Sequence, residues 1–296
     1  MKVVFLGTSA MQPTKERNLF SLLISYKNEN ILVDCGEGTQ RQFKFANLKA
    51  TKVTKIFLTH LHGDHIFGLP GFLQNLEVND YSKVLDIYAP KGINEFINFI
   101  KKLGTFEKLK IRTHVLEHDG KIFENKDFIL ETYKLEHTAP CFGLRFVEKD
   151  RRKINIEYTK KFGLVQHPLL GKLQKGQDIV WKGKKITAKE GTILVKGKII
   201  AVIADTRVCE NCYKIAKDAD LLICEATYLS DLEEKAKEYT HLTAKQAAEI
   251  AKRSNAKKLV LTHFSQRYKN VSWLKEEAKK IFPNVECAKD LMDISV

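Results

Sequence analysis

The chain has 296 residues, of which 44% are hydrophobic and 29% charged, and its formal net charge is +14. This composition excludes a disordered or fibrous chain, and the length suffices for one large α/β domain or two small ones. The opening residues MKVVFLGTSAMQP contain an apolar run too short for a signal peptide, and no apolar stretch is long enough to cross a membrane. We therefore expect a cytoplasmic protein that does not act at a membrane.

Short apolar runs separated by turn signals predict β-strands along most of the chain. The predicted strands cover residues 2–8, 19–26, 30–38, 53–60, 83–90, 128–138, 141–148, 198–206, 219–227 and 256–263. Apolar residues at helical spacing predict helices at 92–104, 243–255 and 272–283. Strands dominate the first half and alternate with helices afterwards, which favours two packed sheets with helices outside them.

One short sequence occurs twice. The hexapeptide KIFLTH at 55–60 is nearly repeated as KLVLTH at 258–263. Each copy reads as a buried strand that ends in Thr-His, so the repeat places His60 and His263 at equivalent strand ends. The repeat also supports two related halves of the chain.

Residues 148–185 interrupt the regular pattern with charge runs, a proline and several glycines. We interpret them as a protruding arm inserted into a single domain that spans 1–296, with an ordinary long surface loop as the alternative. The segment 145–200 holds 15 Lys or Arg and 5 Asp or Glu, a local surplus of ten positive charges. Such a concentration indicates contact with a nucleic acid, although a solvated basic face would also account for part of it.

The six cysteines are scattered, which is typical of reduced thiols in a cytosolic protein. The sequence CENC places Cys209 and Cys212 at a spacing that metal sites use. A structural zinc site of that type needs a second such pair, and the chain has none. We therefore interpret the two cysteines as thiols near the start of a helix.

The segment THLHGDH, residues 59–65, gathers three of the nine histidines and an aspartate. Alternate residues of an extended segment face the same side, so His60 and His62 should point the same way. Gly63 permits a sharp turn, and Asp64 and His65 follow on it. One short loop can thus offer two ligands to each of two metal ions.

Three further candidate ligands, His137, Asp205 and His263, stand where predicted strands open into loops. Imidazole and carboxylate ligands without thiolate favour zinc, with manganese or iron as the alternatives. We expect Asp205 to bridge two metal ions. The expected groups are His60, His62 and His137 for one ion and Asp64, His65 and His263 for the other.

These residues resemble the His-x-His-x-Asp-His signature of the metallo-β-lactamase superfamily. Within it, the chain is most similar to ribonuclease Z, the family of tRNA 3′-processing endoribonucleases. The resemblance covers nearly the full chain. The stretches that carry the narrower resemblance are FLGTSAMQPTKERN at 5–18, LVDCGEGTQRQ at 32–42, ADTR at 204–207, HLTAKQAAEIA at 241–251 and LTHFSQRY at 261–268.

The resemblance implies an α/β protein with the four-layer αββα metallo-β-lactamase fold, two zinc ions per subunit and a homodimer. It also implies that precursor tRNA is the substrate and that the arm at 148–185 grips the tRNA elbow. The chain departs from the family in the arm, where His167-Pro168 stands in place of the usual Gly-Pro pair. The way in which this arm grips tRNA is therefore left open.

The expected reaction is hydrolysis of a phosphodiester, which leaves a 3′-hydroxyl on the tRNA and a 5′-phosphate on the trailer. Two metal ions would clamp the phosphate and generate hydroxide at neutral pH. We expect Asp64 to act as general base and His241 to protonate the leaving oxygen. The helix that follows His241 should disfavour its charged form, and Glu225 is the candidate carboxylate that restores the proton. Asp34 is expected to fix loops beneath the site.

Two other functions compete with this hypothesis. The first is a small-molecule metallohydrolase that acts on a thioester, a lactone or a phosphodiester. The second is an RNA-binding subunit without activity, against which the complete set of metal ligands argues. The sequence leaves open the native metal, the cleavage position and the effect of an encoded CCA end.

Overall fold

The computed structural model describes residues 1–296 and divides the chain into two compact units. The larger unit contains residues 1–123, 130–146 and 199–296, and the smaller unit contains residues 124–129 and 147–198. None of the helices combines the length and the apolar character that a membrane span requires.

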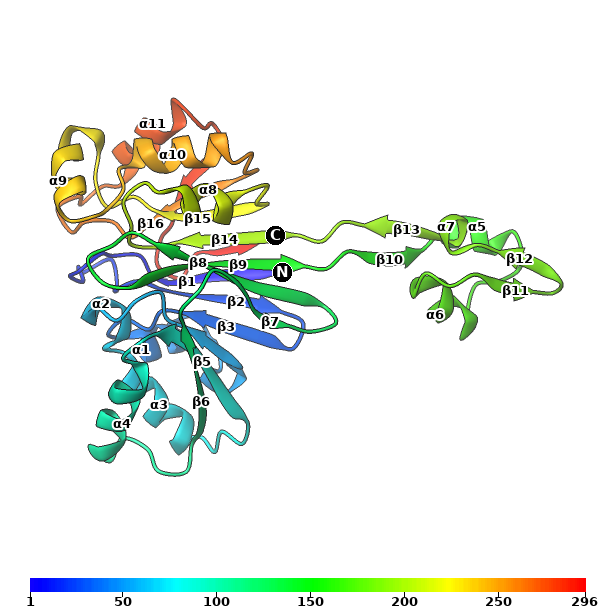
Figure 1. Cartoon of the computed structure of the whole chain (residues 1–296), viewed down its shortest axis with the longest axis horizontal. Helices are drawn as coiled ribbons and strands as arrows, with labels where there is room; N and C mark the ends of the chain where they lie inside the picture. Colours follow the sequence, from blue (N-terminus) through cyan, green and yellow to red (C-terminus); the bar gives the residue numbers. More distant parts are fainter. The chain divides into compact units, whose positions relative to one another are not determined.

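The first sheet of the larger unit has seven strands in the order β18-β1-β2-β3-β4-β5-β6 (Figure 1). Its strands are β1 (Lys2–Gly7), β2 (Ser21–Tyr26), β3 (Glu29–Val33), β4 (Lys55–Phe57), β5 (Val84–Pro90), β6 (Lys110–Leu116) and β18 (Asp293–Ser295). Pairing is antiparallel from β18 to β3 and parallel from β3 to β6. Parallel neighbours need crossover connections, and these connections supply helices to one face of the sheet.

Helices from the first half of the chain cover the outer face of this sheet. They are α1 (Thr39–Phe45), η1 (Ala50–Lys52), α2 (Gly63–Ile66), α3 (Leu69–Val78) and α4 (Ile93–Lys102). Apolar side chains of α1, α3 and α4 form one buried cluster with those of β1 to β5. In α4 the buried residues Ile93, Ile97 and Ile100 recur at helical spacing, as the sequence predicts.

The second sheet also has seven strands, in the order β17-β16-β15-β14-β9-β8-β7. Its strands are β7 (Gly120–Glu124), β8 (Phe128–Leu135), β9 (Cys141–Glu148), β14 (Ile199–Ile203), β15 (Leu221–Glu225), β16 (Leu259–Thr262) and β17 (Val285–Cys287). The strands from β14 to β17 are parallel. The helical segments between them are α8 (Glu210–Ala216), η2 (Ser230–Leu232), α9 (Glu233–Glu238), α10 (Ala244–Arg253) and α11 (Ser272–Lys279).

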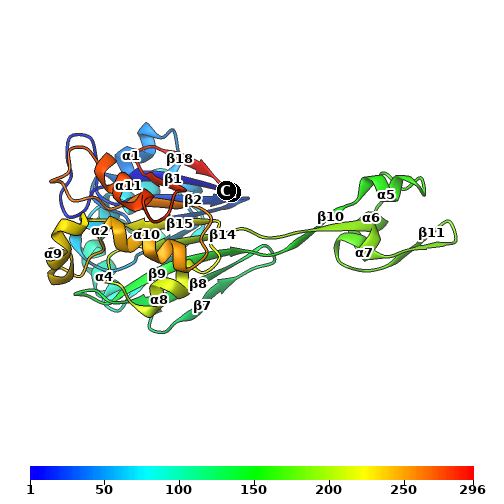
Figure 2. The same cartoon turned by 90° about the horizontal axis from the view of Figure 1, so that it is seen from above.

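The two sheets pack against each other, and the helices lie outside them. Tyr26 on β2 and Phe146 on β9 contact each other across the two sheets, with ring centroids 5.5 Å apart. The helices α8, α10 and α11 lie beside the second sheet (Figure 2). Their apolar side chains form a separate buried cluster with those of β14 to β16. The structure therefore confirms the predicted four layers, α, β, β and α.

The smaller unit has strands, helices and an apolar core of its own. It contains β10 (Arg151–Ile154), α5 (Ile156–Lys160), α6 (Leu169–Gln174), β11 (Ile179–Trp181), β12 (Lys184–Ile186), α7 (Ala188–Gly191) and β13 (Thr192–Val195). β10 pairs with β13, and β11 forms a hairpin with β12. Leu164, Leu173 and Ile186 are fully buried in its core. The unit extends past the predicted end of the arm at residue 185 because β13 returns beside β10.

Candidate metal centre

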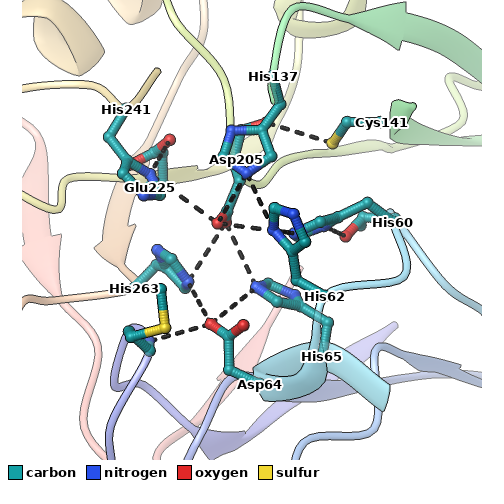
Figure 3. A network of polar contacts seen from close by, with 12 residues as sticks. His60, His62, Asp64, His65, His137, Cys141, Asp205, Glu225, His241 and His263 are labelled. Carbon is teal, nitrogen blue, oxygen red and sulfur yellow. Dashed lines mark hydrogen bonds and ion pairs between the residues drawn. The ribbon is translucent and has the colours of Figure 1, made fainter. Parts of the chain in front are cut away.

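The predicted metal ligands meet at one place in the larger unit, in loops that follow strands (Figure 3). The segment after β4 carries the THLHGDH residues, with Asp64 and His65 in the first turn of α2, and Asp205 follows β14 by two residues. His263 comes directly after β16, and His137 follows β8 by two residues. The carboxyl ends of parallel strands lie at one edge of a sheet, which is why loops distant in sequence converge there.

The first group of donor atoms belongs to His60, His62 and His137. His62 Nδ1 lies 3.0 Å from His60 Nε2 and 3.2 Å from His137 Nε2. Zinc–nitrogen bonds of about 2.05 Å in a tetrahedral site place neighbouring ligand atoms roughly 3.3 Å apart. The three imidazole nitrogens therefore have the spacing that one small cation requires.

The second group consists of Asp64, His65, Asp205 and His263. Asp64 Oδ2 lies 3.3 Å from His65 Nε2 and 3.6 Å from His263 Nε2. His65 and His263 are almost fully buried, as is Asp205. The backbone N–H of Met11 donates a hydrogen bond of 3.0 Å to Asp64 Oδ2, which fixes that carboxylate from a third loop.

Asp205 stands between the two groups and turns one oxygen towards each. Its Oδ1 lies 3.2 Å from His263 Nε2 and 3.5 Å from His65 Nε2. Its Oδ2 lies 3.8 Å from His60 Nε2 and 3.9 Å from His137 Nε2. This is the arrangement of a carboxylate that can bridge two cations.

The far nitrogens of the imidazole rings are fixed by hydrogen bonds. His65 Nδ1 lies 2.7 Å from Asp34 Oδ2, and His137 Nδ1 lies 3.1 Å from the Thr240 carbonyl oxygen. His60 Nδ1 lies 3.0 Å from Thr59 Oγ1. In each case Nδ1–H can donate, which leaves Nε2 unprotonated and turned to the centre.

Asp34 has the supporting role that the sequence predicts. Besides His65, it accepts hydrogen bonds from the Thr59 N–H at 2.7 Å and the Thr59 hydroxyl at 2.8 Å. It thereby ties the loop after β3 to the loop after β4. Asp34 and His263 both have positive φ, 55° and 58°, which side chains other than glycine seldom adopt. Strained backbone of this kind persists where the surrounding contacts over-determine it.

Three atoms of the second group are buried without a hydrogen-bond partner: His65 Nε2, Asp205 Oδ1 and His263 Nε2. A buried polar atom without a partner is costly, and such atoms are rare in folded proteins. All three point to the same place, and all three are chemically suited to bind a divalent cation. The residues present therefore fit the metal ions that the sequence motif implies.

The pKa shifts of the residues in the centre also fit bound cations. Burial lowers the pKa of His60 well below its usual value, and burial also lowers the pKa of His137. Burial acts in the same direction on His65, but the neighbouring carboxylates, with Asp205 the strongest, outweigh it and raise the pKa of His65 well above its usual value. Burial opposes ionisation of Asp64, yet the pKa of this carboxyl falls because His65 and His263 contact it. Two buried carboxylates thus attract positive charge to the centre.

His241 and Glu225 lie beside the centre and contact each other. His241 Nδ1 is 3.1 Å from Glu225 Oε1 and 3.9 Å from Asp205 Oδ2. Glu225 is the last residue of β15, is fully buried, and also accepts hydrogen bonds from the Thr206 N–H at 2.8 Å and the Thr227 hydroxyl at 2.6 Å. Burial lowers the pKa of His241, but the Glu225 carboxylate overrides it and the pKa rises to about 9.

One local expectation is corrected by the structure. His241 does not head α10, which begins at Ala244 after a Thr243 cap; its own N–H bonds to the Ala236 carbonyl oxygen at the end of α9. A helix N-terminus therefore does not govern its charge. Gly63 stands where the extended backbone of His62 turns into α2, and a Cβ at this position would meet the ring of Phe67, an exposed side chain.

The sequence reasoning missed the threonines that orient the histidines. Thr227 Oγ1 lies 3.1 Å from His263 Nδ1, and Thr240 Oγ1 lies 2.8 Å from His137 Nδ1. Cys141 was missed as well; its thiol donates to the Asp205 carbonyl oxygen at 3.2 Å. Thr227 follows the strand end that carries Glu225, a position that could have suggested it. The other two contacts join loops far apart in the sequence and carry no local signal.

Comparison with known proteins places the chain in a family. Residues 1–190 match the family model described as "Anti-Pycsar protein Apyc1". Ribonuclease Z of Bacillus cereus (strain G9842) is 38% identical over 312 residues, which cover 100% of this chain and 99% of that protein.

Solved structures extend the comparison. The short form of human tRNase Z has a TM-score of 0.74 and 32% identity, and the match covers 100% of this chain and 99% of the human chain. YhfI of Bacillus subtilis, a metallo-β-lactamase fold protein, has a TM-score of 0.72 at 21% identity, over 99% of this chain and 98% of that one, and shows the fold. The chain therefore belongs, over residues 1–190, to the family that the Apyc1 model describes and, over its full length, to the ribonuclease Z family.

Proposed function

We propose that this chain is a cytoplasmic, metal-dependent endoribonuclease that removes the 3′ trailer from precursor tRNA. The products are a tRNA 3′-hydroxyl and a trailer 5′-phosphate. One observation carries the proposal: in a full-length relative of ribonuclease Z, Asp205 turns its two oxygens towards two separate groups of metal-binding atoms.

We assign one ion to His60, His62 and His137 and the other to Asp64, His65 and His263, with Asp205 shared between them. Nitrogen and oxygen donors without thiolate favour zinc, with manganese or iron as alternatives. A bound pair of divalent cations would supply positive charge for the phosphate and lower the pKa of a water molecule. We assign the histidines of the two groups no other part in the reaction.

Asp64 is the proposed general base. Its Oδ2 accepts the Met11 N–H and faces His65 and His263. The other oxygen of the carboxylate is then the one that accepts a proton from the attacking water. The hydrogen bond from Met11 keeps the carboxylate plane fixed while this proton moves.

His241 is the proposed general acid. Glu225 holds Nδ1, which orients the ring and leaves Nε2 to protonate the leaving 3′-oxygen. The leaving alkoxide is strongly basic, so a proton donor at this position should contribute about 10²–10⁴-fold to the rate. Glu225 acts through His241, because it is buried and bonded on several sides.

We further propose that the predicted arm, residues 148–185, binds tRNA through phosphate contacts. Most of its lysines are exposed, including Lys182 and Lys184 on the β11–β12 hairpin. His167 and Pro168 form the start of α6, where His167 Nδ1 accepts the Leu169 N–H at 3.2 Å and the His167 ring packs on Trp181. The family resemblance also implies a homodimer. Sedimentation of the full-length protein tests this oligomeric state.

The direct test of the activity uses a tRNA transcript with a 3′ extension. The full-length protein loaded with zinc should release the trailer, and end mapping should find a 3′-hydroxyl on the tRNA and a 5′-phosphate on the trailer. A 2′,3′-cyclic phosphate on the tRNA, or binding without cleavage in each of zinc, manganese and iron, would contradict the proposal.

A further inference from the structure

Cys209 and Cys212 form a close thiol pair that the proposed reaction does not use. Their Sγ atoms lie 3.5 Å apart. Cys209 is the N-cap of α8, and Cys212 lies in the first turn of that helix. A disulfide needs a sulfur–sulfur distance of about 2.05 Å, so a shift of roughly 1.5 Å would join the two atoms.

The two sulfurs differ in access to solvent. Cys212 is fully buried in the apolar cluster between α8 and the second sheet. Cys209 is half-buried and lines a cleft of about 270 Å³, together with Lys134, Glu136 and Asn211. A small molecule in the cleft can therefore meet Cys209. Cys212 is closed off from solvent, and its sulfur contacts that of Cys209.

The two thiols also differ in acidity. The hydrogen bond from Cys212 lowers the pKa of Cys209 to about 6, and backbone N–H groups at the start of α8 add to this effect against the cost of burial. The pKa of Cys212 is raised well above its usual value, because it shares the proton with Cys209 and is buried. Burial raises the pKa of the other thiols too, to about 12 for half-buried Cys287.

A metal site does not account for this pair. The groups of side chains that could hold a metal ion all lie around the centre described above, and neither cysteine belongs to one. A buried thiol behind an accessible, acidic thiol is instead the arrangement in which thiol–disulfide exchange is fast at the outer sulfur.

We propose that Cys209 and Cys212 form a thiol–disulfide exchange site that accepts a low-molecular-weight disulfide in the cleft beside Cys209. The Cys209 thiolate attacks one sulfur of the incoming disulfide RSSR, forming a Cys209–S–SR bond and releasing RS⁻. Cys212 then attacks Cys209 Sγ, forms the internal disulfide and releases the second RS⁻, which takes up the Cys212 proton. The two protein thiols lose two electrons, and RSSR is reduced to two thiols.

Closing the disulfide should affect the metal centre, a consequence that rests on the proposed function. The apolar core holds Cys212 in place, so Cys209 has to move when the disulfide forms. Residues 206–208, just before Cys209, connect it to Asp205. Cys212 Sγ also lies 3.8 Å from the Arg207 carbonyl oxygen, and the Arg207 N–H bonds to the Glu136 carbonyl oxygen at 3.0 Å. We expect the oxidised protein to cleave tRNA more slowly than the reduced protein.

The chemical step is tested on the full-length protein with oxidised glutathione at neutral pH. After an acid quench, free thiols are alkylated and the peptides are read by mass spectrometry. The wild type should form a Cys209–Cys212 disulfide that dithiothreitol reverses. Cys212→Ser should stop at a glutathione adduct on Cys209, and Cys209→Ser should react at least tenfold more slowly at Cys212. The matched control, Cys287→Ser, should behave as the wild type.

The proposal is wrong if Cys212→Ser gains no adduct at Cys209, or if Cys287 and Cys209 react at similar rates. The cleavage rate is then measured on the oxidised and the reduced wild type. Equal rates would overturn the effect on the metal centre and leave the exchange chemistry standing. Failure of the proposed nuclease function shows separately, as absence of cleavage by the reduced protein.

Discussion

His241 Nδ1 lies 3.1 Å from Glu225 Oε1, beside the candidate metal centre. The other histidines that face this centre belong to the two groups around Asp205. His241 is thus positioned to hold a proton, because its ring nitrogen contacts an ionisable carboxylate. Glu225 is buried and has no route to the substrate of its own. The proposed role of this pair is proton donation, and it can be tested separately from metal binding by the groups around Asp205.

Replacing His241 should remove the proton donor and leave the metal centre intact. We expect His241→Ala to lower the cleavage rate by about 10²–10⁴-fold, with metal content and tRNA affinity unchanged. The measurements are single-turnover cleavage, elemental analysis and a binding assay. His114→Ala is the matched control, since His114 bonds to Asp86 at 2.7 Å, outside the centre. Unchanged turnover of His241→Ala would remove its assignment as general acid.

Metal content should respond differently to two ligand substitutions. His137→Ala disrupts only the first group, so the purified protein should retain about half of the wild-type metal. Asp205→Asn weakens both groups, because each carboxylate oxygen faces one of them. It should therefore retain less metal than His137→Ala. If Asp205→Asn kept as much metal as the wild type, the bridging role would be excluded.

Charge reversal in the smaller unit distinguishes tRNA processing from small-molecule hydrolysis. The variant Lys182→Glu with Lys184→Glu should weaken tRNA binding and reduce the slope of log affinity against log salt by about 1 for each lost phosphate contact. Hydrolysis of a small model phosphodiester should not change. Lys214→Glu with Lys217→Glu, exposed in the larger unit, is the control. Tight tRNA binding by the first variant would favour the small-molecule hypothesis.

The carboxyl of Asp290 should make stability depend on pH. It accepts hydrogen bonds from the Thr8 hydroxyl, the Asn18 N–H and the Gln42 amide, but burial dominates and raises its pKa to about 6. Between pH 4 and 6 the folded state then binds more protons than the unfolded state. The contribution of the protonated Asp290 carboxyl to the free energy of unfolding is therefore fully present below the pKa of the unfolded state. It is lost as pH rises through about 6, a change on the order of 2 kcal/mol.

Asp290→Asn should abolish this contribution, since an amide has nearly the same shape and does not ionise. The measurement is the free energy of unfolding by denaturant at pH 4, 5, 6 and 7 for both proteins. The difference between wild type and variant should shift in favour of the variant as pH rises. A difference that is constant across this range would show that Asp290 has an ordinary pKa.

The sequence predicted those parts of the structure that local pattern determines. Residues 59–65 stand out as candidate ligands by their own spacing, and Asp205 and His263 are further candidates because an apolar run ends just before each. β6 was not predicted, because nearly all of its residues are exposed or half-buried at the edge of the sheet and give no apolar run. α3 was not predicted either; Leu69-Pro70-Gly71 reads as a loop, although proline is compatible with the first turn of a helix.

What could not be predicted depends on tertiary contacts. The hydrogen bonds of Thr227 to His263 and of Thr240 to His137 arise only when loops from different strands meet. The charge of His241 likewise depends on Glu225, 16 residues away in the chain, and not on the helix that follows it. The strands of the smaller unit could not be predicted, because they are three or four residues long and too short for periodicity to be read. Only the interruption of the regular pattern, with its charge runs, proline and glycines, indicated an arm there.

The most direct test of the paired centre is a crystal structure of the zinc-loaded protein with anomalous data at the zinc edge. We predict two peaks, one within bonding distance of His60, His62 and His137 and one beside His65 and His263, with one Asp205 oxygen on each. A single peak, or a second peak away from Asp205, would contradict the account.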